Sequence, residues 1–185
     1  MSEYINEQVS RILSKLDMVQ KYETEFRAFG SKKHKYILNA PAPLSLVKEY
    51  QDTFQVNLPI EYVAFVTQIG NGGAGPNYGI QSLKLDLPPA WSVERIRNQY
   101  AAPSQLSTVS RAKKTARDGI YNGLKPICDP GGGGFIWMIV NGESKGRIVN
   151  IPESPHLPVT FYDEITFLDW YESWISGVND GSLLR

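Results

Sequence analysis

The spacing of apolar and polar residues predicts four helices along the chain. The first follows Ser2, a favourable N-cap, and its apolar residues share one face. This face carries Ile5, Val9, Ile12, Leu13, Leu16 and Val19. The same spacing predicts helices over Leu44–Phe54 and Pro59–Ile69. A short aromatic helix follows Thr166, which forms a capping-box pattern with the acid three residues on, and Gly177 is expected to end it.

The third of these helices ends in a glycine-rich turn that formally matches a dinucleotide-binding fingerprint. Gly70, Gly72 and Gly75 satisfy the G-x-G-x-x-G pattern. That pattern binds a pyrophosphate only when a strand precedes the glycines and a helix follows them, and this chain has the reverse order. Pro59 is expected at the first helical position and Gly70 as the helix stop. The turn is therefore predicted to be structural.

The later part of the chain carries the pattern of strands joined by turns. A short strand is predicted over Tyr78–Leu83, and Cys128 lies in another strand that ends at a run of glycines. The apolar run Phe135–Val140 predicts a buried strand, and Arg147–Ile151 returns beside it after a glycine-containing turn. Segment 91–117 gives only a weak helical pattern near its start and a loop after it. Together the elements predict one α+β domain, in which helices flank an antiparallel sheet.

Composition supports a single folded domain and indicates the cellular compartment in which we expect it. Hydrophobic residues make up 42% and charged residues 21% of the 185 residues, which is ordinary globular usage. No apolar run approaches the roughly 20 residues that span a bilayer, and the start of the chain lacks the features of a signal peptide. Cys128 is the one cysteine and cannot form an internal disulfide. These features together predict a cytoplasmic protein without membrane contact.

The net charge is zero, but the charges are unevenly distributed. Residues 101–150 hold seven Lys and Arg against three Asp and Glu, whereas residues 151–185 hold one against six. The basic runs 32–35 and 111–114 are too short for the basic stripe that nucleic-acid binders usually show. Direct nucleic-acid binding is therefore not expected, and the last segment of the chain is acidic.

The residues that could perform catalysis are few. Nucleophilic catalysis needs a nucleophile, a base and an orienting group, and the chain offers one cysteine and two histidines, His34 and His156. Cys128 is expected to be a buried, inert thiol. Adjacent carboxylates such as Asp163 and Glu164 point apart, and no cluster of Cys and His suits zinc. We therefore expect no catalytic residue, metal or cofactor, and a thiol or carboxylate enzyme stays as a third functional alternative.

Two glycine clusters mark turns in which side chains are predicted to be excluded. Gly70, Gly72 and Gly73 form the first, and Gly131 and Gly132 lie in the second. The second cluster lacks the Gly-Lys-Ser/Thr ending of a P-loop, so it is predicted to be a tight turn into a strand. Glycine is costly to order, which suggests that a side chain would clash or that another backbone approaches closely at both turns. An internal turn and a partner surface both fit this requirement.

The order of these motifs resembles the SUKH superfamily, which includes a yeast cell-wall synthesis regulator family and many bacterial immunity proteins. The resemblance rests on Leu58-Pro59 with Tyr62 and Phe65, Gly70 to Gly73, Tyr78-Gly79-Ile80, Ile127-Cys128-Asp129, the Phe135–Val140 strand, Asn141-Gly142 and Phe167-Leu168-Asp169-Trp170. It implies an α+β fold and a role without catalysis. By this resemblance residues 43–185 form a SUKH-like domain with an insert near 91–117, and residues 1–42 form a helical extension packed on it.

In bacteria, members of this superfamily typically protect the producing cell by binding a toxin domain, often a nuclease. The resemblance therefore implies a module that binds a cognate toxin protein, and the alternative is a regulatory scaffold that binds a host protein. An acidic patch could steer association with a basic nuclease cleft, and aromatic residues could anchor the interface. The residues predicted to bind the partner are Asn71, Tyr78, Trp91, Asp163, Glu164, Asp169 and Glu172.

Overall fold

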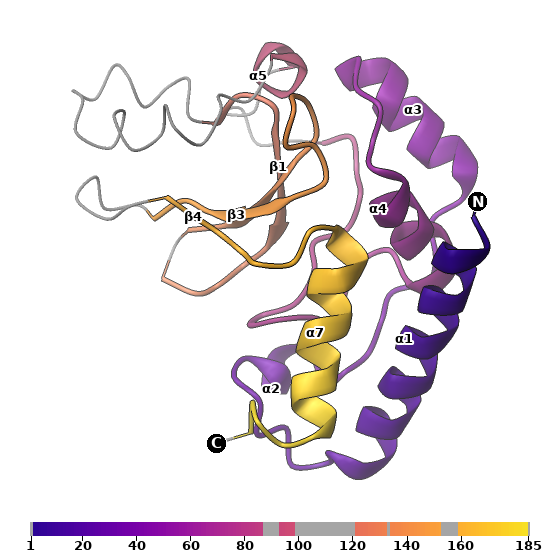
Figure 1. Cartoon of the computed structure of the whole chain (residues 1–185), viewed down its shortest axis with the longest axis vertical. Helices are drawn as coiled ribbons and strands as arrows, with labels where there is room; N and C mark the ends of the chain where they lie inside the picture. The colour runs from indigo at the N-terminus through magenta and orange to yellow at the C-terminus, as the bar shows by residue number, and fades with distance from the viewer. Residues whose placement is uncertain (1, 87–92, 99–120, 133, 153–158, 185) are drawn as a thin grey trace.

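The computed structural model describes residues 2–86, 93–98, 121–132, 134–152 and 159–184 (Figure 1). Its helices are α1 (Glu3–Tyr22), α2 (Ser31–His34), α3 (Leu44–Phe54), α4 (Ile60–Ala64), the π-helix η1 (Phe65–Ile69), α5 (Val93–Arg97) and α7 (Phe167–Asn179). Its strands are β1 (Leu124–Cys128), β2 (Ile136–Ile139), β3 (Ile148–Asn150) and β4 (Thr160–Phe161). The combination of helices and an antiparallel sheet confirms the predicted α+β class.

Local capping sets the start of two predicted helices. The Ser2 hydroxyl accepts a hydrogen bond from the Ile5 N–H at 3.4 Å, so α1 begins where predicted. At α7 the Thr166 hydroxyl accepts from the Asp169 N–H at 3.1 Å. The Asp169 carboxylate accepts from the Thr166 N–H at 3.3 Å, which completes the predicted capping box. Leu13 departs from the predicted apolar face of α1, since it is 42% exposed.

The boundaries of two helices differ from the prediction. Gly177 does not end α7, because the helix continues to Asn179. A Cβ on Gly177 would lie 2.8 Å from the Leu183 Cγ, so the glycine allows the C-terminal segment to pack on the helix. Pro59 occupies the N-cap position of α4, one residue before the first helical position. The predicted single helix is divided into α4 and η1, and Gly70 ends it as expected.

The four strands form an antiparallel sheet in the order β1-β2-β3-β4. In the β2–β3 pair, Trp137 lies opposite Val149, which confirms the predicted antiparallel return of the chain. The β1–β2 pair has a register shift between Pro126 and Cys128. Each strand therefore pairs with the next strand along the sequence, and the sheet is a meander.

The segment Tyr78–Leu83, predicted as a strand, makes only isolated bridges. Ile80 bridges to Cys128 of β1 and to the first glycine turn, but it forms no continuous ladder with either. At the end of the segment, the Leu83 N–H donates to the side-chain oxygen of Asn71 at 2.6 Å. The Asn71 amide donates to the Leu83 carbonyl at 3.2 Å. The strand prediction was wrong, because the segment pairs with β1 and with the glycine turn only at isolated positions and its end is bonded to a side chain.

Side chains alternate along the strands and enter two separate cores on opposite faces of the sheet. The larger core joins one face to the helices, and its fully buried aromatic residues are Tyr36, Tyr50, Tyr62, Phe65, Phe167 and Tyr171. The smaller core contains Leu124, Trp137, Ile139, Val149 and Ile151. The helices therefore dock on one face of the sheet, and the other face has its own apolar cluster.

Helix α1 lies side by side with α7 and also contacts α4 and η1 (Figure 1). Its buried positions, among them Ile12 and Leu16, face these neighbours. None of the helices in the described ranges is long and apolar enough to cross a membrane. The amphipathic face of α1 is thus covered within the fold.

Candidate functional site

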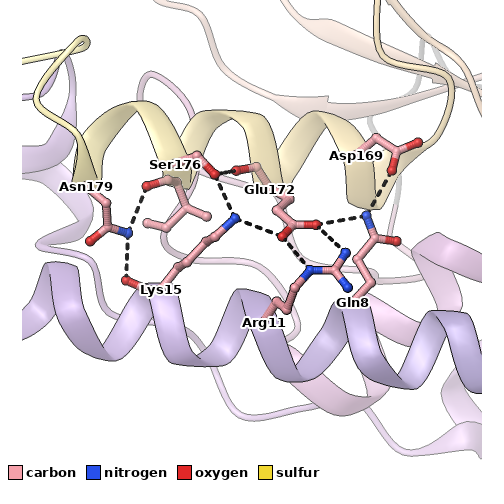
Figure 2. A network of polar contacts seen from close by, with 8 residues as sticks. Gln8, Arg11, Lys15, Asp169, Glu172, Ser176 and Asn179 are labelled. Atoms are coloured by element: carbon pink, nitrogen blue, oxygen red, sulfur yellow. Dashed lines mark hydrogen bonds and ion pairs between the residues drawn. The ribbon is translucent and has the colours of Figure 1, made fainter.

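Two of the predicted partner-binding acids lie between α1 and α7 (Figure 2). The Glu172 carboxylate accepts two hydrogen bonds from Arg11, at 3.0 and 3.1 Å, and one from Lys15 at 2.8 Å. The Gln8 amide donates to Glu172 at 3.1 Å and to the Asp169 carboxylate at 2.9 Å. Three side chains of α1 therefore hold both acids of α7 within the helix pair.

These contacts determine the charge state of Glu172. Burial alone would raise the pKa of its carboxyl group, but the hydrogen bonds from Arg11, Lys15 and Gln8 outweigh burial and lower the pKa to about 2. The Glu172 side chain is only 14% exposed, compared with 48% for Arg11. The sequence does not reveal this cluster, because 161 residues separate Arg11 from Glu172. At neutral pH the carboxylate is ionised, and its charge is balanced inside the molecule.

Asp163 and Glu164 lie before α7 and outside this network. Asp163 is exposed and Glu164 is half-buried. In the described part of the chain, neither carboxylate forms an ion pair with a Lys, Arg or His. Of the four predicted acids, these two therefore keep their charge available at the surface.

The other predicted partner-binding residues differ in their surroundings. The Asn71 side chain is occupied by the backbone contacts described above, and Trp91 lies outside the described residues. The Tyr78 ring lies 5.5 Å from the Phe29 ring, at 66° between the planes, and the Lys33 Nζ lies 5.2 Å from the centre of the Tyr78 ring. Because Phe29 is 51% exposed and Tyr78 half-buried, the two rings form a ridge on the surface, the Phe29–Tyr78 ridge.

Both predicted glycine turns are packed against other parts of the chain. Gly73 has a φ of +100°, and a Cβ here would lie 2.5 Å from the Ile37 carbonyl oxygen. Gly131 has a φ of +85°, and its Cβ would lie 2.7 Å from an edge atom of the Tyr78 ring. The first turn is therefore internal, whereas the second borders a depression of about 350 Å³ beside Tyr78.

A larger groove, of about 420 Å³, lies on the Phe29 side of the ridge. It is enclosed by α7, the loop after α1 and the segment between β4 and α7. Its aromatic lining residues are Phe29, Tyr162, Trp170 and Trp174, and among the described residues its one charged lining residue is Glu164. Trp170 and Trp174 are 4% and 8% exposed, so they form the floor. The predicted acid Glu164 therefore lines the same groove as four aromatic rings, and the sequence analysis did not predict this grouping.

No catalytic arrangement accompanies the groove in the described ranges. The Cys128 thiol is buried, as predicted, and donates to the Pro76 carbonyl at 3.0 Å, and burial raises its pKa to about 12, which favours the uncharged thiol. The His34 ring lies edge-on to Trp174 at 6.0 Å, and burial lowers its pKa to about 4. His156 lies outside the described residues. The part of the chain that is described also contains no group of three His, Cys, Asp or Glu side chains able to hold a metal ion.

Residues 41–172 match the sequence model of the SMI1 / KNR4 family (SUKH-1). The chain belongs to this family. The matched range begins just before α3, includes the whole sheet and ends within α7, whereas α1 precedes it. Members of the SMI1/KNR4 family are generally binding proteins and not enzymes. Neither a curated protein nor a solved structure matches the chain.

The groove is built partly from the SMI1/KNR4 region and partly from its flanks. Tyr162, Glu164 and Trp170 lie inside the matched range, whereas Phe29 and Trp174 lie outside it. The SMI1/KNR4 region thus provides the carboxylate and half of the aromatic lining. The loop after α1 and the second half of α7 complete the groove in this chain.

The SMI1/KNR4 region also contains a buried lysine that sequence reasoning missed. Lys125 of β1 is 3% exposed, and its Nζ lies 5.7 and 5.4 Å from the centres of the Tyr50 and Tyr62 rings. The ammonium donates one hydrogen bond, to the Pro126 carbonyl at 3.3 Å. The available signal was a single lysine inside an otherwise apolar strand segment.

Proposed function

We propose that this chain is an immunity-type binding module, which binds a toxin domain in the cytoplasm and covers its active surface. Membership of the SMI1/KNR4 family supports a protein-binding role without catalysis. The observation that carries the proposal is the aromatic groove beside α7, next to the Phe29–Tyr78 ridge. A nuclease domain is the toxin class that suits an acid-bearing binding face.

The groove and the ridge have the composition of an interface centre. Tryptophan and tyrosine carry a large share of the binding energy where they line pockets that a partner desolvates. Phe29 is 51% exposed and Leu183 is 44% exposed at the edge of the groove. We therefore expect the strongest contacts of the complex at this groove.

Asp163 and Glu164 supply negative charge at the same face. A nuclease presents a basic cleft to its substrate, so these acids would steer the encounter of the two proteins. Replacing both acids by lysine should slow association steeply at low salt, and Glu49→Lys on α3, an exposed acid without an ion pair in the described ranges, serves as the control. An unchanged association rate would remove the electrostatic part of the proposal. Asp169 and Glu172 are expected to contribute less, since α1 already binds them.

Co-expression tests the proposal as a whole. The protein is produced together with the toxin domain encoded beside its gene, and both cell survival and co-purification are scored. Rescue together with a stable complex is the expected result. Failure of both with a well-folded protein would contradict the immunity role and would favour a regulatory scaffold that binds a host protein.

A further inference from the structure

The groove beside α7 presents aromatic rings at a steep angle to one another. The Tyr162 and Trp170 rings lie 5.8 Å apart at 72° between the planes. Phe29 and Trp174 complete the aromatic lining. The backbone beside these rings is fixed, since the Tyr162 N–H donates to the Ile148 carbonyl at 3.1 Å. The aromatic lining of the groove is therefore ordered.

Glu164 adds a negative charge to this lining without a counter-ion. None of the described lining residues is basic. The His34 ring touches Trp174, but burial keeps it uncharged at pH 7 by lowering its pKa to about 4. The Arg147 guanidinium lies on the Phe161 ring and donates to the Tyr162 carbonyl at 2.8 Å. The charge inside the groove is therefore negative and unbalanced by its own lining.

We propose that the groove receives an arginine side chain of the partner protein. This inference rests on the binding function proposed above. A guanidinium stacks on aromatic rings, is weakly hydrated, and forms paired hydrogen bonds with a carboxylate. Phe29 and Tyr162, the more exposed rings of the lining, supply the stacking surface, and Glu164 supplies the carboxylate. A lysine ammonium is a strongly hydrated point charge, so it fits this combination less well.

An apolar side chain is a poorer occupant for the same groove. It would satisfy the rings but would cover the half-buried Glu164 carboxylate without giving it a hydrogen bond. Removing an ionised group from water without a partner is unfavourable. An arginine avoids this cost, because the same side chain contacts the rings and the carboxylate.

Titration with N-acetyl-arginine N-methylamide tests the proposal on the full chain. The readout is the indole N–H resonances of Trp170 and Trp174 in two-dimensional NMR. We expect saturable shifts of both resonances with the arginine probe. The isosteric citrulline amide, which lacks the charge, and the norleucine amide, which is apolar, should bind at least about tenfold more weakly.

Two variants assign the effect to the groove. Glu164→Gln should weaken binding of the arginine probe about tenfold, and Tyr162→Leu should weaken it several-fold. Glu49→Gln on α3 is the matched control, since Glu49 is exposed and does not line the groove, and it should bind as the unmodified protein does. Equal binding of arginine and citrulline, or undiminished binding to folded Glu164→Gln, would overturn the proposal.

The same variants separate this inference from the proposed function. If Glu164→Gln still forms the toxin complex with unchanged affinity, the arginine inference is wrong and the binding function stands. If the arginine probe binds but no toxin complex forms, the groove is confirmed and the immunity role is contradicted.

Discussion

Replacing Lys125 by methionine is expected to stabilise the protein near and below neutral pH. Lys125 is 3% exposed and has one hydrogen bond, to a backbone carbonyl. In the described ranges no carboxylate forms an ion pair with it. A protonated ammonium at this position is therefore buried without a counter-ion. Methionine has a similar shape and carries no charge.

The pKa of Lys125 gives the size of this effect. Burial, together with the charge of Lys84, lowers the pKa from 10.5 to about 7. This difference corresponds to about 5 kcal/mol, which is the upper limit of the cost of protonated Lys125. The cation–π contacts with Tyr50 and Tyr62 offset about 2 kcal/mol. A gain of about 3 kcal/mol at pH 6 is the resulting expectation for Lys125→Met.

The pH dependence has a definite sign. Because the folded pKa lies below the unfolded pKa, the unfolded chain binds more protons between about pH 7 and pH 10.5. The unfolding free energy of the unmodified protein should therefore rise with pH across this window. The advantage of Lys125→Met should be largest at and below about pH 7 and should shrink as the pH rises from about 7 toward 10.5.

Urea unfolding at pH 6, 7.5 and 9 measures these changes. The unmodified protein, Lys125→Met and the control Lys145→Met, an exposed lysine, are compared under identical conditions. The control should follow the unmodified protein at every pH. If Lys125→Met is less stable at pH 6, or if its stability changes with pH as much as that of the unmodified protein, the reasoning from an uncompensated buried charge is refuted.

Three further predictions follow from the fold. Glu172→Gln should lower the free energy of unfolding at pH 7 by about 1 to 2 kcal/mol after allowance for solvent screening. Because the folded pKa of Glu172 is about 2, the stability that Glu172 provides should be lost as the pH falls from about 4.5 toward 2. Acid titration of unfolding checks this, and an unchanged acid limb in the variant would contradict it. Gly73→Ala should lower the melting temperature much more than Gly132→Ala. The new methyl group at Gly73 would clash with the Ile37 carbonyl, whereas at Gly132 it would meet open space and cost only about 1 kcal/mol for the positive φ. Equal melting temperatures would show that the turn can shift. Cys128 should react with a thiol reagent at the rate of unfolding, and rapid labelling in native buffer would contradict its burial.

Local signals in the sequence were sufficient for the helices α1, α3 and α7 and for the central hairpin, whereas α2 was not predicted. The Ser2 cap and the Thr166 capping box act over three residues, so the sequence alone contains them. The Phe135–Val140 run likewise marked β2. The strand predicted over Tyr78–Leu83 failed because the segment makes only isolated bridges and its end pairs with the Asn71 side chain, and these contacts come from outside the segment.

The candidate site was less accessible to sequence reasoning. Glu164 and Tyr78 were singled out, but the groove also needs Phe29, from a loop with no periodic signal, and the floor residues of α7. The acidic charge of Glu172 looked available in the sequence, because the distant side chains of α1 that bind it cannot be inferred from spacing. Lys125 was missed since an isolated lysine in a strand pattern does not show whether it is buried.

The pairing of α1 with α7 joins two segments that are synthesised far apart in time. Because Glu172 follows Arg11 by 161 positions, a ribosome adding about 5 to 20 residues per second needs roughly 8 to 32 seconds to pass from one to the other. During this interval α1 can contact α4 and η1, but the part of its face that packs on α7 has no partner helix. Trp170 and Trp174 emerge with the same late helix. Completion of the groove therefore waits for synthesis of α7, and the capacity to bind a partner lags behind synthesis of α1.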